Sequence, residues 1–389
     1  MKKVYWILSL VVLVFLAFVF VRRESPRADY INVYSWGEFI SDGSEGGMDV
    51  NKEFTKRTGI KVNYKTFQNN EELFAKLSGG MADYDVVIPS DYMVSKLIEN
   101  NMLEKLDFSN IPNFKFISED FKSLDFDPKN EYSVPYVWGM VGILYDKNEV
   151  KVEEENITWD TLWNPKYRGK ILMFDNARDS FAVSLLRLGY SINDKDTEHW
   201  KQAAQELLMQ KPLVQAYVMD QIFNKMQNQE AFLAPYYAGD AATVMKNNPG
   251  VGFVIPKTGS IRFIDSLCIP KNCLHKKYAE EYINFMCETS VALANVKHTG
   301  YSTPHVKAYD ELDDSIKNNK IFYPDSATLK KSQIFTNLPK ELNSLIDKLW
   351  IEVKAGGTTD NPWILPSILI GLLVPYTIVF FVRKRKVLK

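Results

Sequence analysis

The sequence YINVYSWGEFI, residues 30–40, opens a stretch in which strand and helix patterns alternate three times. The strands are rich in β-branched and aromatic residues, and the helices repeat apolar residues every three or four positions. The predicted elements, alternately strand and helix, are 30–35, 49–58, 60–66, 71–78, 84–88 and a helix that carries Met93, Leu97 and Ile98. This order predicts a parallel sheet covered by helices. Asn70 is expected to cap the second helix, because an Asn side chain can accept a backbone N–H at a helix start.

A second, less regular alternation follows. Two predicted strands lead into helices, one from about Asp179 and one from Gly239-Asp240. These two strands are predicted at 170–174 and 232–236, and two further apolar stretches, 253–256 and 267–270, flank residues 259–265. An amphipathic helix over 339–354 should end at Gly356, because glycine readily adopts the left-handed conformation that stops a helix.

The two ends of the chain are hydrophobic and basic. An apolar run of 18 residues, 4–21, follows Lys2 and Lys3, and one of 20 residues, 363–382, precedes the sequence RKRK. Both lengths suit a membrane helix, and clustered basic residues mark the cytoplasmic side. The predicted segments are an N-terminal anchor, a C-terminal membrane helix and a basic cytoplasmic tail: 1–23, 363–382 and 383–389. Both termini would then be cytoplasmic and the body extracytoplasmic, with a cleaved signal peptide as the alternative for the first run.

Charge is unevenly distributed between these ends and the body. The chain has 47 Lys plus Arg and 48 Asp plus Glu, and nine of the basic residues lie in the two end segments, which contain no acid. The body, 24–362, therefore has 47 − 9 = 38 basic and 48 acidic residues, a net charge of −10. This balance argues against a nucleic-acid partner and suits a cationic ligand. With 46% hydrophobic and 24% charged residues, the composition is that of a globular protein.

Signatures of common enzymes and metal sites are missing from the sequence. It has no G-x-S-x-G, no H-E-x-x-H, no Walker lysine loop and no G-x-G-x-x-G after the first strand. The four histidines are scattered without metal-ligand spacing, so no cofactor or metal is expected. The three cysteines do not form a disulfide framework. Free thiols are expected at Cys268, Cys273 and Cys287, with a single Cys268–Cys273 bridge as the alternative.

Acidic and aromatic residues gather at loop positions next to the predicted strands. They are Trp36, Glu38, Asp91, Tyr92, Asp179, Tyr237, Phe263, Asp265 and Tyr301. Ligands of open α/β sheets bind outside the carboxyl ends of the strands. An aromatic face attracts a cation by roughly 0.5–2 kcal/mol, and a carboxylate adds a charge-assisted hydrogen bond. Such a set can therefore form an aromatic and acidic box for an ammonium group.

Each of these residues also has a purely structural alternative. A Trp or Phe at a strand end can belong to the core, and Asp91 or Asp179 can stabilise the N-terminus of a helix. Tyr301 can support the turn before Pro304, and Arg178 can pair with a nearby acid. Spacing alone leaves this choice open.

The same residues lie in short segments that together carry a family resemblance. In order, the segments are YSWGEFI (34–40), FTKRTGIKV (54–62), YDVVIPSDY (84–92), YSVPYVWG (132–139), TWDTLWNPKYRG (158–169), DNARD (175–179), DSLCIP (265–270), TGYSTP (299–304) and YPD (323–325). They run collinearly over about 31–355, which is most of the chain. The series resembles the spermidine/putrescine-binding proteins of polyamine ABC transporters.

The resemblance implies an α/β, two-lobed fold of the periplasmic-binding-protein type, class II, with a ligand cleft between the lobes. Lobe one is expected to comprise 31–139 and 264–309, and lobe two 140–263 and 310–355. Members are receptors and not enzymes: they bind a polyamine, close, and deliver it to the permease of an ABC transporter. For this chain the resemblance implies an extracytoplasmic, membrane-anchored receptor for putrescine or spermidine.

Carried over position by position, the resemblance implies a set of ligand-binding residues. They are Trp36, Glu38, Ser90, Tyr92, Asn176, Asp179, Tyr237, Asp240, Phe263, Asp265 and Tyr301. Asp265 matches the central acid for an amine, and Tyr301 matches a ring that covers the ligand. A last family contact falls near Gln333 or Phe335.

The sequence departs from the spermidine receptors at three of these positions. Asn176 stands where they tend to have an acid, and Tyr237 and Phe263 stand where they tend to have Trp. Asp240 and Phe263 are more similar to the putrescine-preferring members. The departures leave ligand length, and not ligand class, undecided.

Three functions are alternatives to a polyamine receptor. A receptor for a cationic amino acid would need an arginine for the ligand carboxylate, and Arg178 is the nearby candidate, although Asp179 beside it argues against this role. A membrane-tethered enzyme would need a nucleophile and base in the cleft. A polyamine sensor acting on a partner membrane protein also fits the sequence.

Overall fold

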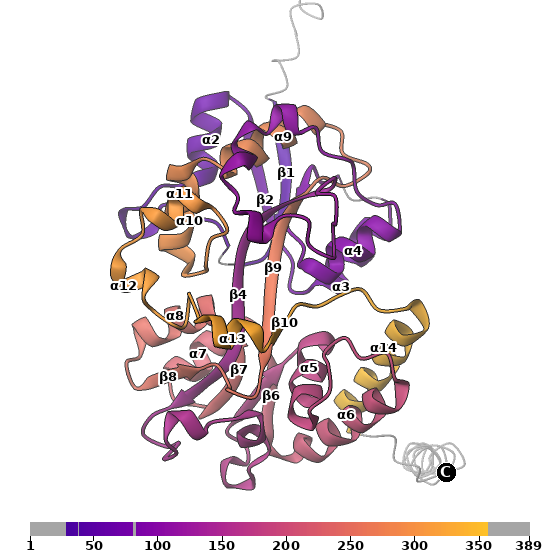
Figure 1. Ribbon diagram of the computed structural model, residues 1–389, viewed down its shortest axis with the longest axis vertical. Helices are drawn as coiled ribbons and strands as arrows, with labels where there is room; N and C mark the ends of the chain where they lie inside the picture. Colours follow the sequence, from indigo (N-terminus) through magenta and orange to yellow (C-terminus); the bar gives the residue numbers. More distant parts are fainter. Residues whose placement is uncertain (1–28, 38, 81–82, 357–389) are drawn as a thin grey trace, which may run out of the picture.

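A computed structural model describes residues 29–37, 39–80 and 83–356 (Figure 1). The strands are β1 (Tyr30–Ser35), β2 (Lys61–Thr66), β3 (Val86–Val87), β4 (Ser133–Asp146), β5 (Ile171–Phe174), β6 (Val214–Val218), β7 (Leu233–Tyr237), β8 (Val251–Val254), β9 (Ser260–Cys268) and β10 (Ser332–Gln333). They form a sheet in the order β2-β1-β3-β9-β4-β7-β5-β6, with β8 paired to β4 and β10 to β9. The predicted α/β class is confirmed.

Two halves of the molecule are joined by β4 and β9, which run antiparallel to each other through the middle (Figure 1). All 14 residues of β4 are buried. The upper half in the figure contains β1 and β2, and the lower half contains β6, β7 and β8. The chain therefore crosses between the halves along these two long strands, and β10 of the C-terminal segment lies beside β9.

Helices flank the sheet in both halves (Figure 1). They are α2 (Val50–Thr58), α3 (Asn70–Ser78), α4 (Asp91–Glu99), α5 (Ala177–Leu188), α6 (Thr197–Gln210), α7 (Ile222–Gln227), α8 (Ala238–Asn247), α9 (Lys276–Met286), α10 (Thr289–Thr299), α11 (Val306–Asp310), α12 (Asp314–Lys317), α13 (Ser326–Lys330) and α14 (Lys340–Ala355). Short 3-10 turns connect several of them. As expected, Gly356 ends α14 in the left-handed conformation.

The predicted strand–helix order of residues 30–98 agrees with the structure, and β1 pairs in parallel with β2 and β3. One local detail was wrong: Asn69, and not Asn70, caps α3 by accepting the N–H of Glu72. Asn70 is the first helical residue, and its side chain accepts the N–H of Ser90 instead. Asn70 thereby links α3 to the start of α4 at the edge of the sheet.

The long central strands were underestimated from the sequence. Residues 259–270 contain one continuous strand, β9, which pairs antiparallel with β3 and β4, so the sheet is mixed and not purely parallel. The strand β4 was not predicted as one element, because its 14 buried residues lack the alternation of a half-exposed strand. The division into lobes at 139/140, 263/264 and 309/310 stays a prediction.

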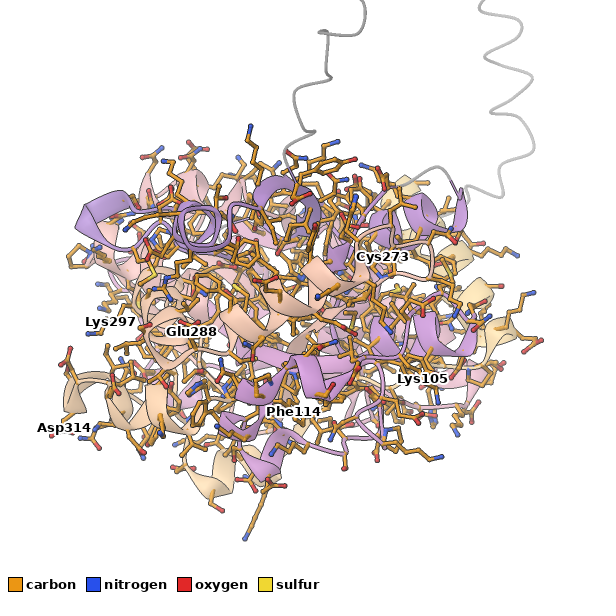
Figure 2. The ribbon with its side chains drawn as sticks, turned by 90° about the horizontal axis from the view of Figure 1, so that it is seen from above. Lys105, Phe114, Cys273, Glu288, Lys297 and Asp314 are labelled. Atoms are coloured by element: carbon orange, nitrogen blue, oxygen red, sulfur yellow. The ribbon has the colours of Figure 1, made fainter. Side chains whose placement is uncertain are left out.

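The predicted membrane segments, 4–21 and 363–382, lie outside the described residues. Within residues 29–37, 39–80 and 83–356, no helix is both long and apolar enough to cross a membrane. The three cysteines are free thiols, as expected, with Cys268 and Cys287 buried and Cys273 half-buried. The thiol of Cys273, which is labelled in Figure 2, lies 3.3 Å from a carboxylate oxygen of the buried Asp85.

Candidate functional site

A cavity with walls from both halves of the molecule contains the predicted site residues. Counted with its open mouth, it encloses about 700 Å³, within the usual size of a small-molecule site. Its walls are formed by Trp36, Gly37, Phe39, Phe67, Gln68, Asn70, Ser90, Tyr92, Asn176, Asp179, Met219, Asp220, Phe223, Tyr236, Tyr237, Asp240, Phe263, Asp265, Tyr301 and Phe335. Loops that follow β1, β3, β5, β6 and β7 all contribute, because these strands point their carboxyl ends toward the cavity.

Ten of the eleven predicted residues line this cavity, and the eleventh, Glu38, lies outside the described residues. Their contact with a ligand stays a prediction. Asp91 does not line the cavity; its carboxylate accepts the N–H of Ile264 and ties α4 to β9. Of the two positions considered for the last family contact, Phe335 lines the cavity, whereas the Gln333 side chain bonds to Ser191.

Aromatic rings form most of the apolar wall and hold one another in place. Tyr301 meets Phe39 edge to face at 5.1 Å and Phe263 at 5.9 Å, and Phe263 meets Tyr237 at 5.3 Å. On the β1 side, the rings of Trp36 and Phe67 are 4.6 Å apart. A continuous row of rings therefore faces the cavity, as expected for a site that receives an organic cation.

Two buried carboxylates stand at the inner end of the cavity. Asp265 accepts the hydroxyl of Ser90 at 2.6 Å, and Asp179 accepts the phenol of Tyr237 at 2.8 Å. Burial raises the pKa of each carboxyl to about 7, and the charge of Asp179 contributes to the raised pKa of Asp265. Burial thus makes the ionised form of each acid costly in the empty cavity, and a bound cation would favour that form.

Two further carboxylates, those of Asp240 and Asp220, act on the phenols of Tyr301 and Tyr236. Tyr301 is hydrogen-bonded to Asp240, and burial together with this acid raises the pKa of the Tyr301 phenol well above its usual value. The pKa of Tyr236 is raised by burial first and then by the charges of Asp240, Asp220 and Asp179. The charges of these three acids therefore all act on one phenol of the cavity wall.

No lysine, arginine or histidine is found among the described residues that line the cavity. Labelled charged side chains such as Lys297 and Asp314 lie at the outer rim of the molecule when it is viewed from above (Figure 2). In its described wall the cavity has four acids, Asp179, Asp220, Asp240 and Asp265, and no basic side chain. A site of this charge attracts cations and repels anions.

Arg178 is buried behind the cavity wall and does not line it. Its guanidinium lies 5.1 Å from the ring centre of Tyr92 and 4.7 Å from that of Phe335. Within the described structure, Nη2 alone of its nitrogens makes hydrogen bonds, both long, to Asn193 and to the carbonyl of Thr336. The arginine that an amino-acid receptor would use therefore contacts two rings of the wall but does not itself line the cavity.

Glycines allow the two halves to meet around the cavity. A Cβ on Gly239, at the start of α8, would lie 2.7 Å from the ring of Tyr301, so any side chain there would collide with that ring. A Cβ on Gly37 would lie 3.3 Å from the carboxylate of Asp220. Both contacts join segments far apart in the sequence, and they place Tyr301 and Asp220 at the boundary of the cavity.

Nine lining residues were not predicted as members of the site: Gly37, Phe39, Phe67, Gln68, Asn70, Met219, Asp220, Phe223 and Tyr236. Most of them belong to apolar or amide types that occur anywhere in a fold, so the sequence gives no signal for them. Asp220 is different, since it is an acid just after β6 and matches the rule used for the other acids. It was missed because β6 itself was not predicted.

The two-lobed α/β arrangement and the acidic, aromatic cavity between its halves define a solute-binding protein of the periplasmic-binding-protein fold. The chain belongs to the family described as bacterial extracellular solute-binding protein, whose model matches residues 50–324. Proteins of this family bind solutes and are not enzymes, so the expectation of a non-catalytic protein is confirmed.

Individual relatives agree with this assignment and confirm the resemblance to spermidine/putrescine-binding proteins. The chain is 35% identical over 325 residues to the spermidine/putrescine-binding periplasmic protein of Escherichia coli strain K12, covering 83% of this chain and 91% of that protein. It is similar to the solved spermidine/putrescine ABC transporter substrate-binding protein of Streptococcus pneumoniae, with TM-score 0.71, 32% identity and coverage of 85% and 99%. A lipoprotein of Treponema pallidum has TM-score 0.73, 27% identity and coverage of 84% and 99%.

Proposed function

We propose that this chain is the extracytoplasmic polyamine receptor of an ABC transporter. It binds putrescine or spermidine in the cavity between its lobes, closes around the ligand, and delivers it to a permease partner. The observation that carries the proposal is that Asp179, Asp220, Asp240 and Asp265 line one cavity together with aromatic rings, without a basic residue in the described wall. The names of these relatives, which refer to spermidine and putrescine, support the same ligand class.

A polyamine fits this cavity better than a cationic amino acid does. Both ligands carry ammonium groups, but an amino acid also carries a carboxylate, which loses its hydration in the cavity and needs a positive partner. Arg178 lies over the rings of Tyr92 and Phe335 and does not line the cavity. Four acids would instead repel the carboxylate.

The proposed roles follow from the position of each group. Asp179 and Asp265 receive one ammonium group at the buried end, because both carboxylates are desolvated and close enough for one to raise the pKa of the other. Tyr237, Phe263 and Tyr301 offer ring faces and edges to the methylene chain and its charged ends. Asp240 stands beside Tyr301 toward the second end.

Calorimetric titration of the full-length chain in detergent tests the function. Putrescine or spermidine should bind with a stoichiometry of one, whereas lysine and arginine should bind at least about 100-fold more weakly, since an unpaired carboxylate in a closed cavity costs several kcal/mol. Lysine or arginine binding as tightly as the polyamines would contradict the proposal, and so would the absence of polyamine binding.

The proposed location follows from the two terminal segments, which lie outside the described residues. We expect residues 30–355 on the outer side of the membrane and both termini in the cytoplasm, because basic residues precede the first hydrophobic run and follow the second. Protease added to intact cells should digest the body and spare a C-terminal tag. A C-terminal tag that is accessible from outside would overturn this topology.

Ligand length is expected to depend on Asn176. This residue caps α5 by accepting the N–H of Asp179, and it lines the cavity as a neutral group. We expect putrescine to bind at least as tightly as spermidine, because the extra arm of spermidine would meet no charge there. Asn176→Asp keeps a good helix cap and should shift the preference toward spermidine about tenfold, if one charge-assisted bond of ~1.4 kcal/mol is gained.

Asn176→Ser is the matched control, since it preserves the cap and adds no charge; its preference should equal that of the wild type. Both ligands are titrated against all three proteins. A wild type that favours spermidine tenfold or more, or an unchanged preference in Asn176→Asp, would refute this account of ligand length.

A further inference from the structure

Asp220 is a cavity acid that was not among the predicted ligand-binding residues. It follows β6, lines the cavity and is exposed, unlike the buried Asp179 and Asp265. An exposed residue of the wall lies where the cavity opens to solvent, which is called the mouth below. The surrounding wall nevertheless withdraws enough water from its carboxyl group to raise the pKa. Among the described residues, no hydrogen-bond donor or basic side chain pairs with its carboxylate. Both oxygens are therefore available to a cationic group that enters the mouth.

Asp220 is oriented toward the opposite half of the molecule. Its Oδ2 lies 3.3 Å from the point where a Cβ on Gly37 would stand. Gly37 directly follows Trp36 at the end of β1, so the carboxylate stands across the mouth from a loop that carries an aromatic ring. The absence of a side chain at Gly37 permits this approach.

The charge of Asp220 also reaches into the cavity. It contributes to the raised pKa of the Tyr236 phenol, as do Asp179 and Asp240. By contrast, the causes of the raised pKa of Asp265 are burial and the charge of Asp179, without a contribution from Asp220. The cavity therefore has acids of two kinds: Asp179 and Asp265 are buried, whereas Asp220 is exposed and lies close to Gly37.

We propose that Asp220 binds the outer ammonium group of a bound diamine while Asp265 holds the inner one, so that Asp220 selects ligands with two charged ends over monoamines. This inference rests on the proposed polyamine-binding function and assigns a residue to one end of the ligand. A monoamine of the same length would occupy the inner end alone. It would bring an apolar end to the mouth, where Asp220 gains no partner.

The test compares putrescine with 1-butylamine, which has the same four-carbon chain and one ammonium group. Both ligands are titrated into three full-length proteins: the wild type, Asp220→Asn and Asp265→Asn. Where the affinity for butylamine is too low for direct titration, it is measured by displacement of bound putrescine. Asp220→Asn should lower the affinity for putrescine about tenfold, which corresponds to one charge-assisted hydrogen bond. Its affinity for butylamine should stay within twofold of the wild-type value. Asp265→Asn should weaken both ligands.

Two control variants separate local contact from general charge. Asp347→Asn removes an exposed acid of α14 that does not line the cavity. The affinity for each ligand should therefore change by no more than twofold. Asp220→Glu keeps the charge at the mouth and should restore most of the preference for putrescine. Circular dichroism and the melting temperature verify that each variant is folded, which is expected for Asp220→Asn because Asp220 is exposed and makes no side-chain bond in the described structure.

Each outcome decides between the two proposals. Putrescine binding within twofold of wild type in folded Asp220→Asn would overturn the role of Asp220 and leave the receptor function intact. Equal weakening of putrescine and butylamine would also overturn it, because Asp220 would then act on the cavity as a whole. Failure of the wild type to bind any polyamine would overturn the receptor function itself, and the role of Asp220 with it.

Discussion

Asp265→Asn should lose most of the affinity for putrescine, about 30-fold to several thousand-fold. The carboxylate of Asp265 is buried, and its hydrogen bond from Ser90 leaves the second oxygen for a ligand. Asparagine has the same shape and can still accept the Ser90 hydroxyl, so the change removes the charge and little else. The loss of one partner of a desolvated charge pair costs about 2–5 kcal/mol, which corresponds to that range of affinity.

The titration should be performed at pH 8, where the carboxyl of Asp265, with a pKa of about 7, is ionised. Ser90→Ala serves as the matched control, because it removes the hydrogen bond and keeps the charge. Its effect should be smaller than that of Asp265→Asn by at least a factor of ten, since a neutral donor contributes about 1 kcal/mol. Asp265→Asn with an affinity within threefold of wild type would mean that the site is elsewhere.

Putrescine affinity should fall steeply between pH 8 and pH 5. Asp179 and Asp265 both have a pKa of about 7, raised chiefly by burial, and an ammonium group binds their ionised forms. At pH 5 each carboxyl is two pH units below that pKa. Affinity should therefore drop about 100-fold for each carboxyl that must be ionised in the complex.

Other charged groups around these two acids act in both directions. Glu71 of α3 raises the pKa of Asp179 by repulsion, whereas Arg178 and the hydrogen bond from Tyr237 lower it. On the other acid, the Ser90 hydroxyl lowers the pKa. Titrations at pH 5, 6, 7 and 8 in two buffers of different ionisation enthalpy measure the affinity and the protons released on binding. A constant affinity without proton release over this range would contradict the prediction.

The stability of the ligand-free protein should respond to pH in the opposite sense. Each of these carboxyls has a pKa near 3.8 when unfolded and about 7 when folded. The folded state therefore holds the protons more tightly, and the stabilisation present below pH 3.8 is lost as pH rises through 7. Between pH 5 and pH 8 the melting temperature of Asp265→Asn should decline less than that of the wild type, because the variant lacks one of the two titrating groups.

Several parts of this protein could be read from local sequence. The strand–helix order of residues 30–98 follows from side-chain types and periodicity, which act over a few neighbouring residues. The end of α14 follows from Gly356, because a helix end is a local structure. The family could be recognised from a collinear series of short segments, and ten of the residues it implied line one cavity.

Local patterns were misleading where burial came from distant segments. The strands β4 and β9 are buried on both sides by elements far away in sequence, so they lack the alternation that marks a half-exposed strand. The assignment of the α3 cap to Asn70 failed for a related reason. Asn69 and Asn70 are both good caps by type, and the contact of Asn70 with Ser90 leaves Asn69 for the helix end.

The sequence by itself determined the fold class, the family and the residue types of the site, because these depend on short-range patterns and on an ordered series of segments. Only the tertiary structure decided which acids share a cavity and how strongly they are charged. The raised pKa values of Asp179 and Asp265, the position of Arg178 behind Tyr92 and the placement of Asp220 across from Gly37 all arise from segments that meet in space. Burial and proximity are properties of the packed molecule, so no single stretch of the chain contains them.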